Sequence, residues 1–387
     1  MTDLIKRDDL IKIYNSKTVN PYISFERFKV NSGRTETKKL VVDDASTFNL
    51  TNWTTQYMDY KLPKGILSSI KFSVPFTITG SPTGAVWAPL TIISGIQLLD
   101  EGNKVIQDID EYTLSQILFN MCSYDDQLKG TRQGICSTST TGFTFRTCLP
   151  FGSNLGNNNR DNSFFERILP IKTNNTFKYR IYYKTSAAAI YTFTGGTTPA
   201  ALPASAPVLT GEYIIFDNKE DENAIYEFYK VNPYNFLSAI TNKKSVTFTS
   251  TTDTQQDLQL SNSIVNEAIA GFIYSFVLTS NLNLTTGVGY FTTQSGIYDS
   301  TNRVINPIIS SFDVELDMNS RDLFPYNAYT YLQFNGVGSV FEIDQCGVSR
   351  LDTSDPHLIL NSIAGVTAAT YTMYCGTLLM RAMFIKY

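Results

Sequence analysis

The sequence predicts an all-β protein: two tandem eight-stranded jelly-roll sandwiches, with a short N-terminal helix and one or two short helices in the connections. Three observations predict this class. Apolar residues alternate with polar ones over many short segments, which is the pattern of half-buried strands. Turn residues separate these segments, and helical periodicity is rare. The sequence also repeats itself once along its length.

The internal repeat consists of three matches that occur in the same order in both halves of the chain. Each match recurs about 200 residues later, far beyond the period of a solenoid repeat. We therefore expect two copies of one domain: an N-terminal helical arm and extended segment at 1–37, a first jelly roll at 38–235 and a second at 236–387. The matched segments are 38–41 and 243–246, 70–78 and 272–278, and 94–106 and 295–305.

Residues 1–20 are expected to form a short amphipathic helix that ends before Pro21. Asp8 precedes Lys12 by four residues, a spacing that supports a helix. The helix either docks on its own domain or serves as an assembly arm that reaches a neighbouring subunit or a membrane surface. Its apolar residues are Leu4, Ile5, Leu10, Ile11 and Tyr14.

In the first half, the strand at 70–79 alternates without interruption, and Pro75 on its polar face indicates an edge strand or a bulge. Residues 100–103 are of hairpin type, and Asp110 is expected to cap a helix that carries Leu114 to Met121. The segments 152–163 and 187–211 are expected to be long loops, and 217–223 a polar loop. The other expected strands are 90–99, 105–109, 143–148, 177–183, 213–216 and 225–231.

Residues 232–242 are expected to cross to the second half, which ends in a strand at 378–385. Apolar residues occupy both faces of that strand, so both faces are expected to be covered. The other expected strands are 246–249, 272–279, 288–292, 312–318, 329–334 and 371–374.

The composition favours large subunit contacts. Charged residues make up 17% of the chain, against about 25% in an average soluble domain. The 23 Tyr and 25 Phe residues supply contact area suited to interfaces. A net charge of −4 disfavours direct, sequence-specific nucleic-acid binding. The acidic start of the chain, with no apolar run that could span a bilayer, indicates folding in a cytoplasm, and the five cysteines are expected to be buried reduced thiols.

Little in the sequence indicates chemistry. A Ser-His-Asp or Cys-His site would have to use His357, the one histidine, which is expected to lie in a loop with no nucleophile motif nearby. The segment 217–223 could hold Ca²⁺ through oxygen ligands, but we favour a solvated polar turn. We expect no catalytic residues, no cofactor and no metal site, and so no enzyme.

Several of these features occur together in a known family. Leu62–Ile66 precedes the long alternating strand, the hairpin at 98–106 is followed by a helix, and Ile225–Tyr229 leads into a second, similar sandwich. In this order of elements the chain resembles the double jelly-roll major capsid proteins of tailless icosahedral viruses with an internal membrane, the tectivirus-like and adenovirus-hexon lineage.

The resemblance implies a major capsid protein that forms homotrimers, with six sandwiches around a threefold axis as a pseudo-hexagonal capsomer of the virion shell. Its implied partners are neighbouring capsomers, penton and vertex proteins and, through the N-terminal arm, an internal membrane or minor capsid proteins. The family has no catalytic residues to transfer.

Two other classes of protein stay open. A carbohydrate-binding or host-attachment β-sandwich protein would also be all-β and rich in tyrosine, but it would need neither two similar sandwiches nor an amphipathic arm. A secreted glycosidase would need a carboxylate pair and a signal peptide, and the acidic start of the chain argues against the latter.

Overall fold

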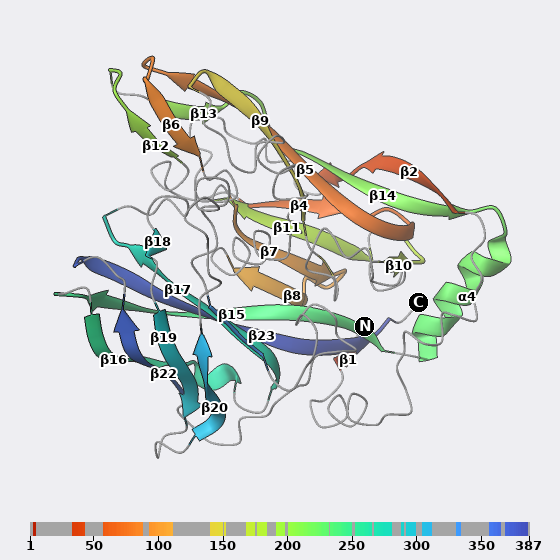
Figure 1. Ribbon diagram of the computed structural model, residues 1–387. Coiled ribbons are helices and arrows are strands. Elements are labelled where there is room, and N and C mark those ends of the chain that lie inside the picture. Colours follow the sequence, from red (N-terminus) through yellow and green to blue (C-terminus); the bar gives the residue numbers. More distant parts are fainter. Residues whose placement is uncertain are drawn as a thin grey trace.

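Figure 1 shows the computed structural model, which contains two β-sandwiches joined through one helix. The structure describes residues 3–4, 33–42, 57–87, 93–110, 140–149, 151, 168–174, 176–183, 191–197, 200–231, 233–249, 252–264, 267–280, 288–289, 292–298, 304–311, 330–333, 356–364 and 368–385. All statements about structure below concern these residues.

The first sandwich consists of two antiparallel sheets. In sheet 1A the order is β10 (Leu169–Ile171), β5 (Gly65–Thr79), β14 (Val208–Phe216) and β2 (Gly33–Lys39), and β9 (Gly142–Leu149) and β13 (Ala200–Pro203) also pair with β5. In sheet 1B the order is β3 (Val41–Val42), β4 (Tyr57–Lys61), β11 (Phe177–Tyr183), β7 (Ile93–Asp100) and β8 (Val105–Asp110). A separate hairpin pairs β6 (Gly84–Trp87) with β12 (Tyr191–Thr194).

The second sandwich repeats this arrangement. In sheet 2A, β15 (Tyr234–Thr247), β1 (Asp3–Leu4) and β17 (Ala268–Leu278) pair with β23 (Thr370–Phe384), and β18 (Val288–Gly289) and β21 (Thr330–Gln333) pair with β17. In sheet 2B the order is β16 (Thr252–Gln259), β22 (His357–Ala364), β19 (Thr292–Tyr298) and β20 (Val304–Ser311). A short 3₁₀ helix, η5 (Asn262–Ile264), follows β16.

The two sandwiches have the same strand order, strand for strand. The order β2–β14–β5–β9 in sheet 1A corresponds to β15–β23–β17–β21 in sheet 2A, and β4–β11–β7–β8 corresponds to β16–β22–β19–β20. The segments that matched in sequence occupy corresponding strands: 70–78 lies in β5 and 272–278 in β17. The fold prediction of two tandem jelly rolls is therefore confirmed.

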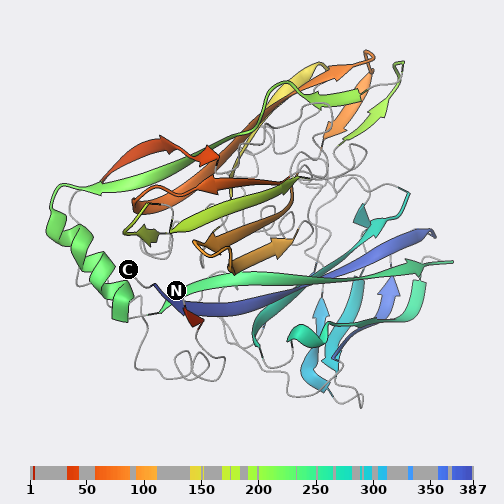
Figure 2. The same ribbon diagram turned by 180° about the vertical axis from the view of Figure 1, so that it is seen from behind.

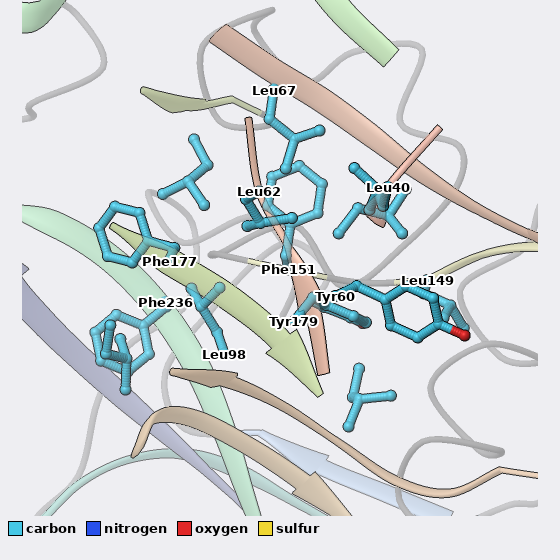
Figure 3. Close-up of a cluster of buried hydrophobic side chains, with 14 of the residues drawn as sticks. Leu40, Tyr60, Leu62, Leu67, Leu98, Leu149, Phe151, Phe177, Tyr179 and Phe236 are labelled. Carbon is cyan, nitrogen blue, oxygen red and sulfur yellow. The ribbon is translucent and has the colours of Figure 1, made fainter. Parts of the chain in front are cut away.

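Alternation along β5 explains how the first core forms. Ile70, Phe72, Val74 and Phe76 are all buried on the inner face, because side chains two residues apart point to the same side of a strand. Figure 3 shows the facing side chains of sheet 1B, among them Tyr60, Leu98 and Tyr179, in the same cluster. The second core is a separate cluster around Phe276, Tyr371 and Met373.

The hairpin between β7 and β8 has the geometry that its sequence predicts. Asp100 Oδ1 accepts hydrogen bonds from the backbone N–H groups of Gly102 (2.9 Å) and Lys104 (2.8 Å). Asn103 adopts a positive φ of 60°, which Asn tolerates better than most residues.

Sequence reasoning was wrong about the segment that joins the two jelly rolls. Residues 225–231 were expected to be a strand and 217–223 a loop, but α4 (Lys219–Val231) covers most of both. Asn218 accepts a hydrogen bond from the Glu220 N–H at 3.0 Å, as an N-cap does, and three acidic residues in the first turn favour the positive end of the helix dipole. Ile225, Tyr226 and Tyr229 lie on the buried side, with helical rather than alternating spacing.

Four further expectations need correction. Leu4, expected in a helix, lies in β1 and pairs with Met383 of β23, because an unpaired edge there accepts a strand. The expected loop at 187–211 contains β12, β13 and the start of β14, and the expected crossing at 232–242 lies mostly in β15. Pro75 is in a central strand, not an edge strand. Its carbonyl accepts from Ala204 N in the gap between β13 and β14, where no ladder partner needs the N–H that proline lacks.

The remaining strand predictions have mixed outcomes. The strands at 177–183, 105–109 and 213–216 are confirmed, and β23 is buried on both faces from Cys375 to Leu379. The helix expected from Asp110 to Met121, the loop at 152–163 and the strand at 312–318 lie outside the described residues, apart from Asp110 itself, which ends β8.

Candidate functional site

His357, the one histidine of the chain, begins strand β22 and is not in a loop as expected. Its Nδ1 lies 2.8 Å from Oδ1 of Asp257 in the neighbouring strand β16. Lys244 donates to the Asp257 backbone oxygen at 2.6 Å. The imidazole therefore contacts a partly exposed carboxylate, and a lysine bonds to the backbone of the same residue. Asp257 takes the Nδ1 side of the ring, as the acid of a triad does, but within the described residues no hydroxyl or thiol hydrogen-bonds to the imidazole.

Two features of the described residues concern metal and redox chemistry. Within the described ranges, no group of three or more His, Cys, Asp or Glu side chains is placed to hold a metal ion. Cys375 is a free thiol that is fully buried in β23, and burial raises its pKa well above the ordinary value, so its reactive thiolate is disfavoured. The prediction of a buried reduced thiol is confirmed for this cysteine.

The outer face of sheet 1B carries a cation held between aromatic rings. Asp59 accepts two hydrogen bonds from Arg180, from Nε at 2.6 Å and from Nη2 at 2.8 Å. The Arg180 guanidinium lies 4.6 Å from the centre of the Tyr57 ring and 5.9 Å from that of Tyr182. Tyr182 in turn donates to Gln97 at 3.1 Å. Cation–π contacts and a bidentate pair make this a rigid, preorganised face, and Tyr57 is exposed.

Sequence reasoning missed this cluster, although one signal was available. Asp59 and Tyr57 lie on the outward-facing side of β4, and Arg180 and Tyr182 lie on the outward-facing side of β11. The two strands are far apart in sequence, so only the register that pairs Asp59 with Arg180 reveals the contact.

The contact between the two jelly rolls is the other preorganised surface. Strands β8 and β15, the edges of sheets 1B and 2A, lie side by side (Figures 1 and 2). The backbone N–H of Asp108 donates to Ser238 Oγ at 3.2 Å, and Asp110 acts electrostatically on Tyr374 of β23. Phe236 of β15 is fully buried and lies beside Phe177 and Leu98 of the first jelly roll (Figure 3). The second jelly roll therefore contributes side chains to the first core.

Several large apolar side chains stay exposed at the surface of the single chain. Val231 at the end of α4 is 72% exposed and Val41 in β3 is 61% exposed. Tyr57, Val105, Leu202 and Val208 are exposed to smaller degrees.

Of the residues predicted to form the assembly arm, the structure places one. Leu4 pairs with the chain's own β23, while Ile5, Leu10, Ile11 and Tyr14 lie outside the described residues. Among the helices that the structure does describe, none is long and apolar enough to cross a bilayer.

The fold of this chain matches solved structures, although its sequence matches no known family. No family model matches the sequence, and no curated protein matches it by sequence. Solved structures do match over almost the whole chain. The capsid of the virus PBCV-1 matches with a TM-score of 0.59 at 10% identity, covering 91% of this chain and 95% of that one. The PBCV-1 protein VP54, fitted into a reconstruction of the virophage Sputnik, matches with a TM-score of 0.60 at 11% identity, covering 92% and 97%.

The Faustovirus major capsid protein matches with a TM-score of 0.54 at 7% identity, and 99% of each chain is covered. The protein therefore has the double jelly-roll fold of these viral capsid proteins, at a level of sequence identity that shows the fold alone. The fold predicted from the resemblance is confirmed.

Proposed function

We propose that this protein is the major capsid protein of an icosahedral virion, and that its role is structural and not catalytic. The observation that carries the proposal is the double jelly roll itself, which matches viral capsid proteins from end to end. Two complete, equivalent sandwiches in one chain provide two equivalent wall units per subunit. A binding module of the carbohydrate-recognising class would need one sandwich and would gain nothing from a matched second one.

The proposed assembly unit is a homotrimer, in which six jelly rolls form a pseudo-hexagonal capsomer. The low charge content and the many tyrosines and phenylalanines support large, permanent interfaces between subunits. We propose the domain limits 38–235 and 236–387 for the two jelly rolls. The proposed location is the shell of the virion, after folding in the host cytoplasm, with penton and vertex proteins and neighbouring capsomers as partners.

The test is the mass and shape of the purified protein. Light scattering at micromolar concentration should give three times the chain mass of 43.3 kDa, and electron microscopy should show hexagonal particles or shells. A monomer under these conditions would count against the capsid proposal. His357→Ala should leave trimers and shells unchanged, whereas loss of a hydrolytic activity in that variant would revive an enzymatic role.

We further propose that residues 5–20 form an assembly arm that contacts a membrane, a minor capsid protein or a neighbouring subunit. Because β1 pairs with β23, the arm would leave its own domain just after Leu4. Replacing Leu10, Ile11 and Tyr14 together by Ser keeps β1 intact and should give folded trimers that assemble poorly. Leu10→Phe, Ile11→Leu and Tyr14→Phe together, which keep the apolar character, make the control. Normal shells from the Ser variant would reject the arm.

A further inference from the structure

Three turns at one end of the first jelly roll are rich in lysine. They lie at 62–64 between β4 and β5, at 101–104 between β7 and β8, and at 172–174 before β11. The lysines of these turns and of the strand ends beside them are Lys61, Lys64, Lys104, Lys172 and Lys178. The chain as a whole has a net charge of −4, so this end is a positive region on an acidic protein.

Hydrogen bonds hold these turns against one another. The Lys64 backbone N–H donates to Oδ1 of Asn174 at 2.7 Å, which joins the first turn to the third. Nζ of Lys178 donates to Oδ1 of Asn103 at 3.1 Å, which joins the start of β11 to the second turn. The lysines therefore come from separate parts of the sequence but belong to one surface.

The acids of the same segments are Asp100 and Glu101. Asp100 is 7% exposed, and its carboxylate is used as the acceptor for the backbone N–H groups of the turn at 101–104. Glu101 is exposed at the tip of that turn. The positive charge of the surface therefore exceeds the negative charge that these segments supply.

Lys172 differs from the other lysines because an acid of α4 lies near it. The residue before it, Ile171, accepts a hydrogen bond from the Tyr226 hydroxyl of α4 at 3.2 Å through its backbone oxygen. The same hydroxyl lies 3.1 Å from the carboxylate of Glu222. The site is therefore assigned to the other four lysines.

Two of these four lysines lie opposite each other across neighbouring strands. Lys61 of β4 pairs with Lys178 of β11, and the buried pair next to them, Tyr60 and Tyr179, points to the core. Like charges directly opposite each other in a sheet are destabilising. An anion between two ammonium groups removes this repulsion and accepts charge-assisted hydrogen bonds from both. The pair therefore favours an anionic ligand.

We propose that four lysines of this end form a site for a ligand with several phosphate groups, either a free polyphosphate or the headgroups of phospholipids. The four are Lys61, Lys64, Lys104 and Lys178. Lysine suits this chemistry because its ammonium group is a compact charge with three donors. The four side chains start from two strands and two turns, so a ligand with several phosphates can contact more of them than a single phosphate can. The site goes beyond the proposed capsid role, which does not require it.

Two measurements on the full-length protein test the site and separate the two sources of phosphate. The first is urea unfolding with and without tripolyphosphate, which should raise the midpoint because a ligand that binds only the folded state stabilises it. The second is co-sedimentation with vesicles of phosphatidylcholine and phosphatidic acid, against vesicles of phosphatidylcholine alone. A response to tripolyphosphate alone assigns a free polyphosphate, and a response to the acidic vesicles alone assigns lipid headgroups.

Lys61→Gln together with Lys178→Gln should weaken the binding of the phosphate ligand by about a hundredfold, because two charge-assisted contacts are lost. Without ligand, the same variant should have a higher urea midpoint than the unchanged chain, because the opposed charges are gone. A purely structural role of the two lysines predicts a lower midpoint. The opposite signs of the two effects therefore distinguish a binding site from a stabilising contact.

Two further double variants complete the design. Lys39→Gln with Lys243→Gln removes the same net charge from exposed positions of β2 and β15, and it should keep the full response to the phosphate ligand. Lys64→Gln with Lys104→Gln changes only exposed side chains of the turns, so it should fold normally and still lose most of the response.

Three outcomes would overturn the proposal. The first is no response of the unchanged chain in either measurement, or an equal response of the chain and both site variants. The second is an equal loss in the control variant, which would show that only net charge matters. The third is tighter binding of duplex DNA than of either phosphate source, lost in the same variants, which would assign the surface to a nucleic-acid backbone. Light scattering tests the capsid function separately, so these outcomes leave it standing.

Discussion

Phe236→Ala is the sharpest test of how the two jelly rolls depend on each other. The side chain belongs to β15 of the second jelly roll but is fully buried among residues of the first, beside Phe177 and Leu98 (Figure 3). Truncating a fully buried phenylalanine removes its transfer free energy and leaves a cavity, at a cost of about 3–5 kcal/mol. Because this cluster joins residues of both jelly rolls, the structure predicts that the loss extends to the first jelly roll.

A matched control exists inside the second core. Phe248 is also buried, and its ring centre lies 5.4 Å from that of Phe276 and 5.7 Å from that of Tyr371. Phe248→Ala removes the same atoms at a similar cost, but all of its contacts lie within the second jelly roll. The two variants therefore remove the same side-chain atoms and differ only in which part of the molecule is destabilised.

Hydrogen exchange by mass spectrometry separates the two cases, because it reports the opening free energy of each segment. In Phe236→Ala, the protected amides of β7 and β11 should exchange faster by about two to three and a half orders of magnitude, the equivalent of the expected destabilisation. In Phe248→Ala the increase should appear in β16 and β17, with β7 and β11 little changed. Unchanged exchange in β7 and β11 of Phe236→Ala would refute a core shared between the jelly rolls.

Three further predictions concern single features. Asp59→Asn weakens the bidentate pair with Arg180 and should lower the free energy of unfolding in urea by about 1.5–3 kcal/mol. Its control is Glu227→Gln, in the exposed pair with Lys230, which should change that free energy by less than about 0.5 kcal/mol. Equal effects of the two substitutions would show that the Asp59–Arg180 pair stabilises the fold no more than an exposed ion pair does. Gly142 has φ of 136°, and a Cβ there would lie 2.5 Å from the backbone oxygen of Phe76, so Gly142→Ala should destabilise β5–β9 pairing by about 1–3 kcal/mol. Gly102→Ala in the exposed hairpin should cost less, and the reverse order would contradict the strain. Burial raises the pKa of Tyr60 and Tyr183, whose hydroxyls lie 3.3 Å apart. Because the folded state holds both phenols neutral, their contribution to the free energy of unfolding is fully present below the unfolded-state pKa of about 10 and is lost as pH rises above it. Tyrosinate absorbance should therefore appear in a cooperative step together with unfolding, and smooth ionisation of all 23 tyrosines in the folded protein would show that they are accessible.

Parts of the molecule were predictable because their signal is local. The alternation at 70–79 predicted the buried face of β5, and the turn residues at 100–103 predicted a hairpin that the structure contains. The order of the internal matches predicted two sandwiches with one strand order. In each case, a few neighbouring residues carry the information that determines the outcome.

Other parts failed where two local patterns compete. The apolar residues at 225–229 fit a strand as well as a helix, and Asn218 with the acidic first turn decided for the helix. Leu4 fitted a helical stripe, but a free edge of β23 offered backbone hydrogen bonds to a strand. The cluster of Asp59, Arg180 and Tyr57 could not be read from either strand alone, since it depends on the register between them.

The amino-acid sequence alone therefore predicted the duplication and several of the strands, and it sets the low content of charged residues. Tertiary structure decided that β8 and β15 lie side by side and that Phe236 is buried against residues of the other jelly roll. The physical reason is range: periodicity and turn chemistry act between neighbouring residues, whereas edge contacts and shared cores depend on partners that only the folded chain brings together.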